Sequence, residues 1–132
     1  MTKDYSLLMV LITISSGATC GALLRYALSA WLNPKLAFLP SGTLICNLIG
    51  AFLIGLITAY LYARAGISPY IKLFAVTGFL GSFTTFSTFS LESVNLFLQS
   101  GISWRPLCHI LLHLVGSITL AFLGLILGKR IF

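Results

Sequence analysis

Polar side chains recur on single faces of otherwise apolar segments, and they are the residues here that could do chemistry. Thr43 and Asn47 stand four positions apart, as do His109 and His113, and Ser117 follows after four more. A spacing of three or four places side chains on one face of a helix. Hydroxyls, an amide and imidazoles offer hydrogen-bond donors, whereas cation filters use carbonyl or carboxylate rings. The pattern therefore gives a small anion a slight advantage over a cation as the ligand.

The segment from 77 to 90 is unusual for an apolar chain. It holds two glycines and seven Ser or Thr side chains in fourteen residues. Glycine costs a helix roughly 1 kcal/mol against alanine, and hydroxyls can bond backbone carbonyls. We therefore expect a broken or kinked helix, which a membrane tolerates only where it is buried or lines a polar site. Phe86 and Phe89 share a face of this segment and can turn the positive edges of their rings toward an anion.

Membrane-spanning helices must position these residues. The chain has 132 residues, of which 58% are hydrophobic and 8% charged, whereas a soluble domain carries roughly 25% charged residues. Uncharged runs over 5–24, 36–63, 73–91 and 106–128 each reach the roughly 18 apolar residues that cross a bilayer. The cations that give a net charge of +6 are dispersed and flank these runs. We interpret them as interfacial anchors, and not as a nucleic-acid site.

We expect one all-α transmembrane domain over residues 1–132. Its four helices are predicted at about 5–32, 41–63, 70–99 and 104–130, with short turns rich in proline, glycine and serine between them. The first helix is not predicted to be a cleaved signal peptide, because it continues to Arg25 without a small-x-small cleavage site.

We interpret the glycine pairs and the cysteines within the spans as packing residues. The glycine pairs at 17 and 21 and at 124 and 128 have the spacing of close helix packing. The three cysteines, Cys20, Cys46 and Cys108, show neither a metal-ligand spacing nor a disulfide framework. We interpret the cysteines as buried packing residues.

The polar residues leave alternatives open. Asn47 suits a bond to a neighbouring helix as well as a pore, and Arg25 can equally reach a lipid headgroup. Glu92 fits a proton carrier or a lone acid that bonds another helix. A metal site at His109 and His113 is disfavoured, because no carboxylate or cysteine shares their helix face.

These residues together resemble a known family. The pattern Gly-x-x-x-Gly-x-x-x-Arg-Tyr at 17–26 resembles the first-helix signature of the Fluc/CrcB fluoride channels. The run GTLICNLIGAF at 42–52 is similar to the second helix of that family. TGFLG at 77–81 and TTFSTFS-x-E at 84–92 are similar to the third. The resemblance covers nearly the whole chain.

The resemblance implies a fluoride-selective channel of the inner (plasma) membrane that exports the toxic anion passively, and not an enzyme. It implies two pores in an antiparallel, dual-topology homodimer within the lipid bilayer. The implied pore residues, with those associated with the pore and the arginine near its vestibule, are Asn47, Phe86, Phe89, Ser117, Thr43, Glu92 and Arg25.

The resemblance also implies a structural sodium ion at the dimer interface. Main-chain carbonyls of Gly81 and Thr84 would hold it, with Gly78 opening the break in the third helix. Carbonyls freed by a break are hard oxygen ligands, and a two-fold axis supplies two identical sets. Ser82 stands where the family often has a second glycine, and Phe83 where it has a small aliphatic residue. The carbonyl geometry needs no particular side chain there, so we expect it to survive.

The cations predict an orientation bias. Positions 3, 64, 72, 129 and 130 lie on the side of the termini, whereas 35 and 105 lie on the opposite side. Because orientation follows cation asymmetry, most copies should have cytoplasmic termini. Either the charges at positions 129 and 130 have little effect on the orientation, or the chain pairs with an oppositely oriented paralogue instead of with itself.

Other classes fit less well. A small drug-exporting antiporter needs an acid within its first helix, where this chain has only the interfacial Asp4; its one intramembrane acid is Glu92. A subunit of a larger membrane complex would not need a broken helix. Cys108 and His109 are adjacent, so their side chains diverge on a helix, and no nucleophile–base pair supports an enzyme.

Overall fold

The computed structural model describes residues 6–33 and 38–132, and every regular element in those ranges is a helix. The first two spans are α1 (Leu7–Leu32) and α2 (Ser41–Ala63). The third span comprises α3 (Pro69–Lys72), the π-helix η1 (Leu73–Leu80), α4 (Gly81–Phe83) and α5 (Phe86–Ser100). The fourth comprises α6 (Trp104–Leu111), the π-helix η2 (Leu112–Gly116) and α7 (Ser117–Ile131).

These four spans are long and apolar enough to cross a membrane, which confirms the expected all-α membrane fold. The expected helix bounds lie within about two residues of the observed ones wherever both are described. The expected start near Tyr5, the turn at Pro34 and the charges Lys3, Asp4 and Lys35 lie outside the described residues.

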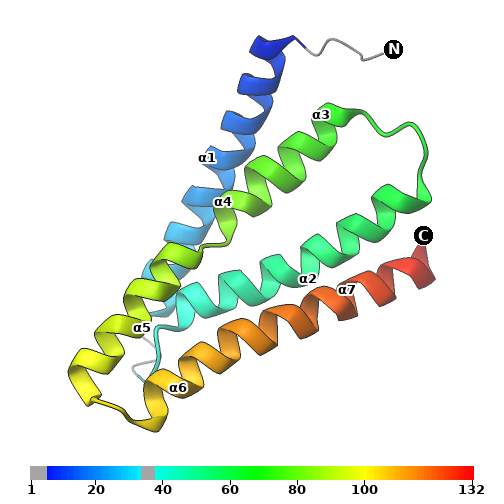
Figure 1. The fold of residues 1–132 in the computed structure, drawn as a ribbon. Coiled ribbons are helices and arrows are strands. Elements are labelled where there is room, and N and C mark those ends of the chain that lie inside the picture. The colour runs from blue at the N-terminus through cyan, green and yellow to red at the C-terminus, as the bar shows by residue number, and fades with distance from the viewer. Residues whose placement is uncertain (1–5, 34–37) are drawn as a thin grey trace.

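The four spans pack mainly as two pairs. The first span packs on the third, through contacts of α1 with η1 and α4, and the second packs on the fourth, through contacts of α2 with α7. Figure 1 shows that α1 begins, α2 ends, α3 begins and α7 ends toward the same end of the bundle. Successive spans therefore run in opposite directions, as short connections require.

Glycines allow the spans to approach closely. A Cβ at Gly17 would lie 2.5 Å from the Phe74 carbonyl oxygen, and a Cβ at Gly21 would overlap the Phe79 carbonyl. On the other pair of spans, a Cβ at Gly124 would overlap the carbonyl of Phe52. The packing role predicted for the glycine pairs is confirmed, because backbone faces backbone at these positions.

The third span is broken at Thr84 and Thr85. Both have extended backbone angles, with φ −89° and ψ 158° at Thr84 and φ −154° and ψ 125° at Thr85. The expectation that Gly78 opens this break is wrong, since Gly78 lies in the helical backbone of η1. A Cβ at Gly78 would come within 3.0 Å of the Gly17 Cα, so the glycine at position 78 allows α1 to pack closely on η1.

Candidate functional site

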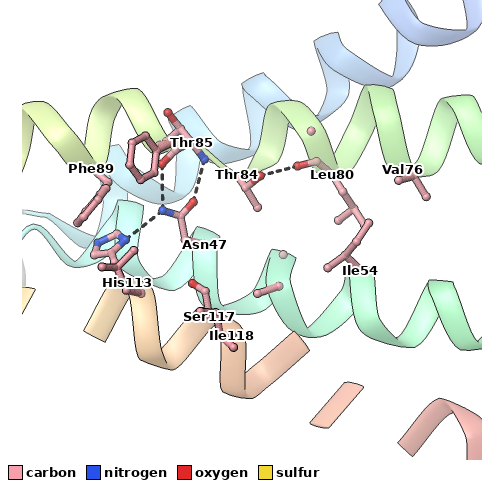
Figure 2. A pocket seen from close by; sticks show the side chains of 15 residues that line it. Asn47, Ile54, Val76, Leu80, Thr84, Thr85, Phe89, His113, Ser117 and Ile118 are labelled. Carbon is pink, nitrogen blue, oxygen red and sulfur yellow. Dashed lines mark hydrogen bonds between the residues drawn. The ribbon is translucent and has the colours of Figure 1, made fainter. Parts of the chain in front are cut away.

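A cavity of about 410 Å³ lies beside the break. Residues from the last three spans line this cavity. Figure 2 shows their side chains converging from α2, from both halves of the third span and from the fourth span. Six of the residues that the resemblance implies for the pore and the sodium site line it: Asn47, Gly81, Thr84, Phe86, Phe89 and Ser117. His113, which the sequence spacing also singled out, lines it as well. The structure therefore gathers most of the predicted site residues around one cavity, although their roles in conduction stay predictions.

Asn47 holds the broken backbone from the neighbouring helix α2. Its Oδ1 accepts the Thr85 backbone N–H at 2.8 Å, and its Nδ2 donates to the Thr85 carbonyl at 3.0 Å. The second Nδ2 hydrogen points to His113 Nδ1, also at 3.0 Å. Figure 2 shows this amide bridging the break and the fourth span. Asn47 Oδ1 thus substitutes for the helical acceptor that the Thr85 N–H has lost, and Nδ2 adds a second donor to the Thr85 carbonyl at the start of α5.

The break diverts two backbone donors from their helical acceptors. In a continuous helix, the Gly81 carbonyl would accept from the Thr85 N–H, which here donates to Asn47. The Thr84 carbonyl would accept from the Thr88 N–H, which instead donates to the Thr85 hydroxyl at 3.3 Å as the cap of α5. Two carbonyl oxygens are thereby released from their usual donors, and hard oxygens of this kind suit Na⁺.

Phe86 and Phe89 differ sharply in exposure. Their ring centroids are 5.3 Å apart, yet Phe86 is 71% exposed in the single chain whereas Phe89 is 6% exposed. The Phe89 ring packs on the His113 ring, with centroids 4.5 Å apart. Phe89 is therefore fixed by its neighbours, while Phe86 extends from the bundle at the mouth of the cavity.

Two predicted site residues lie together on another side of Phe89. Thr43 is 2% exposed, and its hydroxyl donates to Glu92 Oε1 at 2.7 Å. Neither residue lines the cavity beside the break; Glu92 instead borders a second, more polar cavity near Arg105. The acid is thus bonded to another helix, which was one of the alternatives left open by the sequence.

Arg25 bonds the backbone next to the break, and its predicted place near the pore vestibule stays a prediction. Its Nε donates to the Ser82 carbonyl at 3.0 Å, just before the break, and Arg25 does not line the cavity. A cation at the C-terminal end of a helix segment is stabilised by the carbonyls exposed there. Arg25 therefore stabilises the end of α4 from α1.

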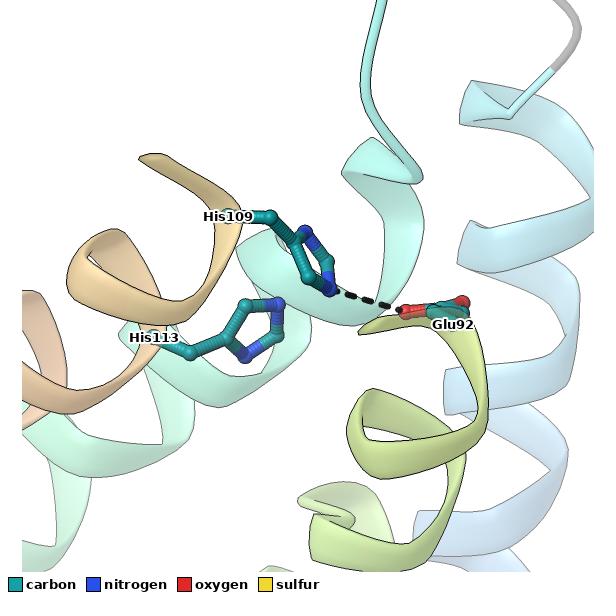
Figure 3. A group of neighbouring side chains, drawn as sticks. All are labelled: Glu92, His109 and His113. Atoms are coloured by element: carbon teal, nitrogen blue, oxygen red, sulfur yellow. Dashed lines mark ion pairs between the residues drawn. The ribbon is translucent and has the colours of Figure 1, made fainter. Parts of the chain in front are cut away.

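His109 and His113 do have a carboxylate beside them, which corrects the expectation drawn from their own helix. Glu92 approaches them from α5, and one ligating atom from each of the three residues lies within 4.8 Å of the others. Figure 3 shows the two rings and the carboxylate facing one another. Sequence spacing could not reveal this, because the contact joins two different spans.

Comparisons with known proteins match nearly the whole chain. The sequence profile of the family described as "CrcB-like protein, Camphor Resistance (CrcB)" matches residues 12–125. A protein from Acinetobacter baumannii named "Fluoride-specific ion channel FluC" is 47% identical over 115 residues, covering 87% of this chain and 90% of the relative. Proteins of the same name from Burkholderia thailandensis and Nitrosospira multiformis are 46% and 43% identical, over 87% and 92% of this chain and 89% and 94% of theirs.

Proposed function

Because the chain belongs to the CrcB family, we propose that it is a fluoride-specific ion channel whose pore passes the break in the third span. It is a multi-pass protein of the plasma membrane, and it is a transport protein and not an enzyme. The observation that carries the site assignment is the Asn47 amide, which bridges the break beside a cavity that also receives Phe86, Phe89 and Ser117.

The electrostatics of this cavity suit a small anion. The N-terminus of α5 lies at the break, and the positive end of a helix dipole favours negative charge. The second Nδ2 hydrogen of Asn47 bonds a neutral imidazole nitrogen, for which an anion can substitute as a stronger acceptor. The Phe86 and Phe89 rings can present positive edges to the same ion.

The assembly we propose is an antiparallel pair of chains. The 71% exposure of Phe86 is readily explained if a second copy covers the mouth of the cavity. The Gly81 and Thr84 carbonyls, freed from their helical donors, would then hold a structural sodium ion together with the same pair from the partner. Sodium bound there would be coordinated by the four carbonyl oxygens and would join the two broken helices.

The proposed function is tested with purified protein in proteoliposomes loaded with potassium fluoride or potassium chloride. After valinomycin is added, fluoride should leave the vesicles rapidly. Chloride should leak out no faster than it does from protein-free vesicles. Equal release of the two anions would contradict a fluoride-specific channel, and release of neither would contradict a channel.

Replacing Phe86 with isoleucine should slow fluoride efflux at least about tenfold, a barrier increase of about 1.4 kcal/mol. Isoleucine keeps apolar bulk but has no polarised ring edge to place against the anion. Because Phe86 is largely exposed in the chain, folding should change little. The matched control is Phe122→Ile: Phe122 is 61% exposed on α7, does not line the cavity, and should leave efflux unchanged. Equal efflux from the two variants would argue against an aromatic pore wall.

Reporter fusions after Phe132 test whether the pair is formed by copies of one chain. An antiparallel self-dimer requires comparable signals from a reporter active only in the cytoplasm and one active only outside it. A protein of fixed orientation carries the same reporters as the control. Signal from the cytoplasmic reporter alone would exclude the self-dimer and favour an oppositely oriented paralogue, as the cation count suggests.

A further inference from the structure

Glu92, His109 and His113 form a group of metal-ligating side chains beside the proposed pore, and His113 also lines the cavity at the break. They come from α5, α6 and η2, and their ligating atoms lie within 4.8 Å of one another. His109 Nε2 is 3.8 Å from Glu92 Oε2. Figure 3 shows all three groups directed into the same small space between the third and fourth spans.

The facing atoms of this group lack hydrogen-bond partners. Among the described residues, Glu92 Oε2, His109 Nε2 and His113 Nε2 are buried without an acceptor or donor. His109 is 0% exposed and His113 is 4% exposed. An unsatisfied buried polar atom costs about 1–3 kcal/mol, so three of them around one space indicate a missing common ligand.

We propose that these three residues form a binding site for a divalent transition-metal ion of the Zn²⁺ type. Two imidazole nitrogens and one carboxylate oxygen are the donor set of many three-ligand zinc sites, which keep a fourth position open. Bonds of about 2.0–2.2 Å in tetrahedral geometry place ligands about 3.3–3.5 Å apart. The His109 Nε2–Glu92 Oε2 separation is 3.8 Å, and all three ligating atoms lie within 4.8 Å of one another, so side-chain rotations must draw the ligands together around an ion.

The Glu92 carboxylate indicates that the ligand of this site is a cation and not an anion. Two imidazole N–H groups alone could hold an anion, but Glu92 Oε2 faces the same space 3.8 Å from His109 Nε2. A carboxylate repels an anion and attracts a cation at this distance. Imidazole ligands then select a transition metal over Na⁺, Mg²⁺ or Ca²⁺, which prefer oxygen.

A further hydrogen bond orients one of the three ligands. The Thr43 hydroxyl donates to Glu92 Oε1 at 2.7 Å, which leaves Oε2 free for a metal. Such an outer contact is typical of metal-ligating carboxylates. At His113, Asn47 Nδ2 lies 3.0 Å from Nδ1, and this amide donor opposes the tautomer that a metal on Nε2 requires.

Glu92 also borders the second cavity of about 370 Å³, whose lining includes Asn33, Pro40, Gln99 and Arg105. Neither histidine lines this cavity, and Glu92 Oε2 is buried. A metal ion that enters from the second cavity must therefore displace the groups that cover the carboxylate oxygen.

A metal ion bound at this site should also slow fluoride conduction, a consequence that rests on the proposed fluoride function. When a metal takes His113 Nε2, the ring proton must sit on Nδ1, where it faces the Asn47 Nδ2 hydrogens. Two donors then oppose each other, and the Asn47–His113 bond breaks. Metal binding thereby disturbs the amide that holds the break.

Cobalt titration of the tag-free dimer in detergent tests binding without reference to fluoride. Co²⁺ should produce the visible absorption of a four-coordinate site, saturate at one ion per chain, and be displaced by Zn²⁺. The Glu92→Gln variant and the His109→Asn/His113→Asn double variant should each lose the signal, whereas Cys108→Ser should keep it. Thr43→Val should weaken binding about 10–100-fold while leaving the ligands in place. No signal from the wild-type protein, or an unchanged signal from both ligand variants, would overturn the proposal.

Zinc added to fluoride-loaded proteoliposomes tests the consequence for conduction. Zn²⁺ should slow wild-type efflux, EDTA should restore it, and the double variant should be insensitive if it conducts. Metal binding with unchanged wild-type efflux would overturn the inhibitory role. If the wild-type protein conducted no fluoride, the proposed function would fail, and the cobalt result would still decide the metal site.

Discussion

Asn47→Asp is expected to reduce fluoride efflux at least about 100-fold, a barrier increase of about 2.7 kcal/mol. The two side chains have nearly the same shape, but aspartate when ionised cannot donate. It loses the bonds from Nδ2 to the Thr85 carbonyl and to His113, and it keeps only the bond from the Thr85 N–H. Its negative charge would also face the anion at short range in a medium of low dielectric constant.

Efflux from the Asn47 variant is compared per amount of folded protein, measured by size-exclusion chromatography before reconstitution. Asn95→Asp is the matched control, because it makes the same chemical change at an exposed position of α5 outside the cavity beside the break. We expect that control to stay within about threefold of wild type, a barrier change of about 0.65 kcal/mol. A folded Asn47→Asp dimer with wild-type efflux would show that the amide is not part of the anion pathway.

Gly55→Ala is expected to lower the free energy of unfolding by about 3 kcal/mol, at the upper end of typical overpacking costs. A Cβ at Gly55 would overlap the Ala121 carbonyl and lie 2.8 Å from the Leu125 backbone nitrogen. Backbone atoms of α7 cannot rotate away, so the two helices must separate. The gain in helix propensity of about 1 kcal/mol from replacing glycine is too small to offset this cost.

The measurement is the thermal unfolding of the purified protein in detergent, with Gly116→Ala as the control. A Cβ at Gly116 would meet only the Leu48 Cδ2 atom, at 2.8 Å, and that flexible end can move. The control should therefore retain wild-type stability. Equal unfolding temperatures for the two variants would refute the close packing of α2 on α7.

The spans could be predicted from the sequence because each is an uncharged run long enough for a bilayer. The helix starts at Ser41 and Trp104 coincide with the expected ones, since local turn residues and interfacial groups determine them. Helix packing through glycines was also evident, because small residues at a spacing of four have few other uses within a membrane.

The position of the break could not be derived from the third span alone. The resemblance implied that Gly78 opens the break, but the chain leaves the helix at Thr84 and Thr85. The reason lies in another helix, where Asn47 supplies both a donor and an acceptor to Thr85. A side chain that replaces the helical acceptor of the Thr85 N–H stabilises the break at this position, and its reach is a property of the folded bundle.

The approach of Glu92 to the two histidines is missing from any local pattern for the same reason. Residues 92 and 109 belong to different spans, and only the packing of α5 on α6 brings them to 3.8 Å. The exposure of Phe86 has a further cause, which we infer to be a second chain. Contacts between chains lie beyond both the sequence pattern and the single folded subunit.

The most direct test of the anion pathway is a crystal structure of the assembled protein in a lipid environment with fluoride present. We expect an antiparallel pair with a narrow tunnel beside each break, lined by Asn47, Phe86, Phe89 and Ser117, and with Phe86 covered by the partner. A structure in which Phe86 and Ser117 face acyl chains, with no tunnel beside Thr84 and Thr85, would contradict the account.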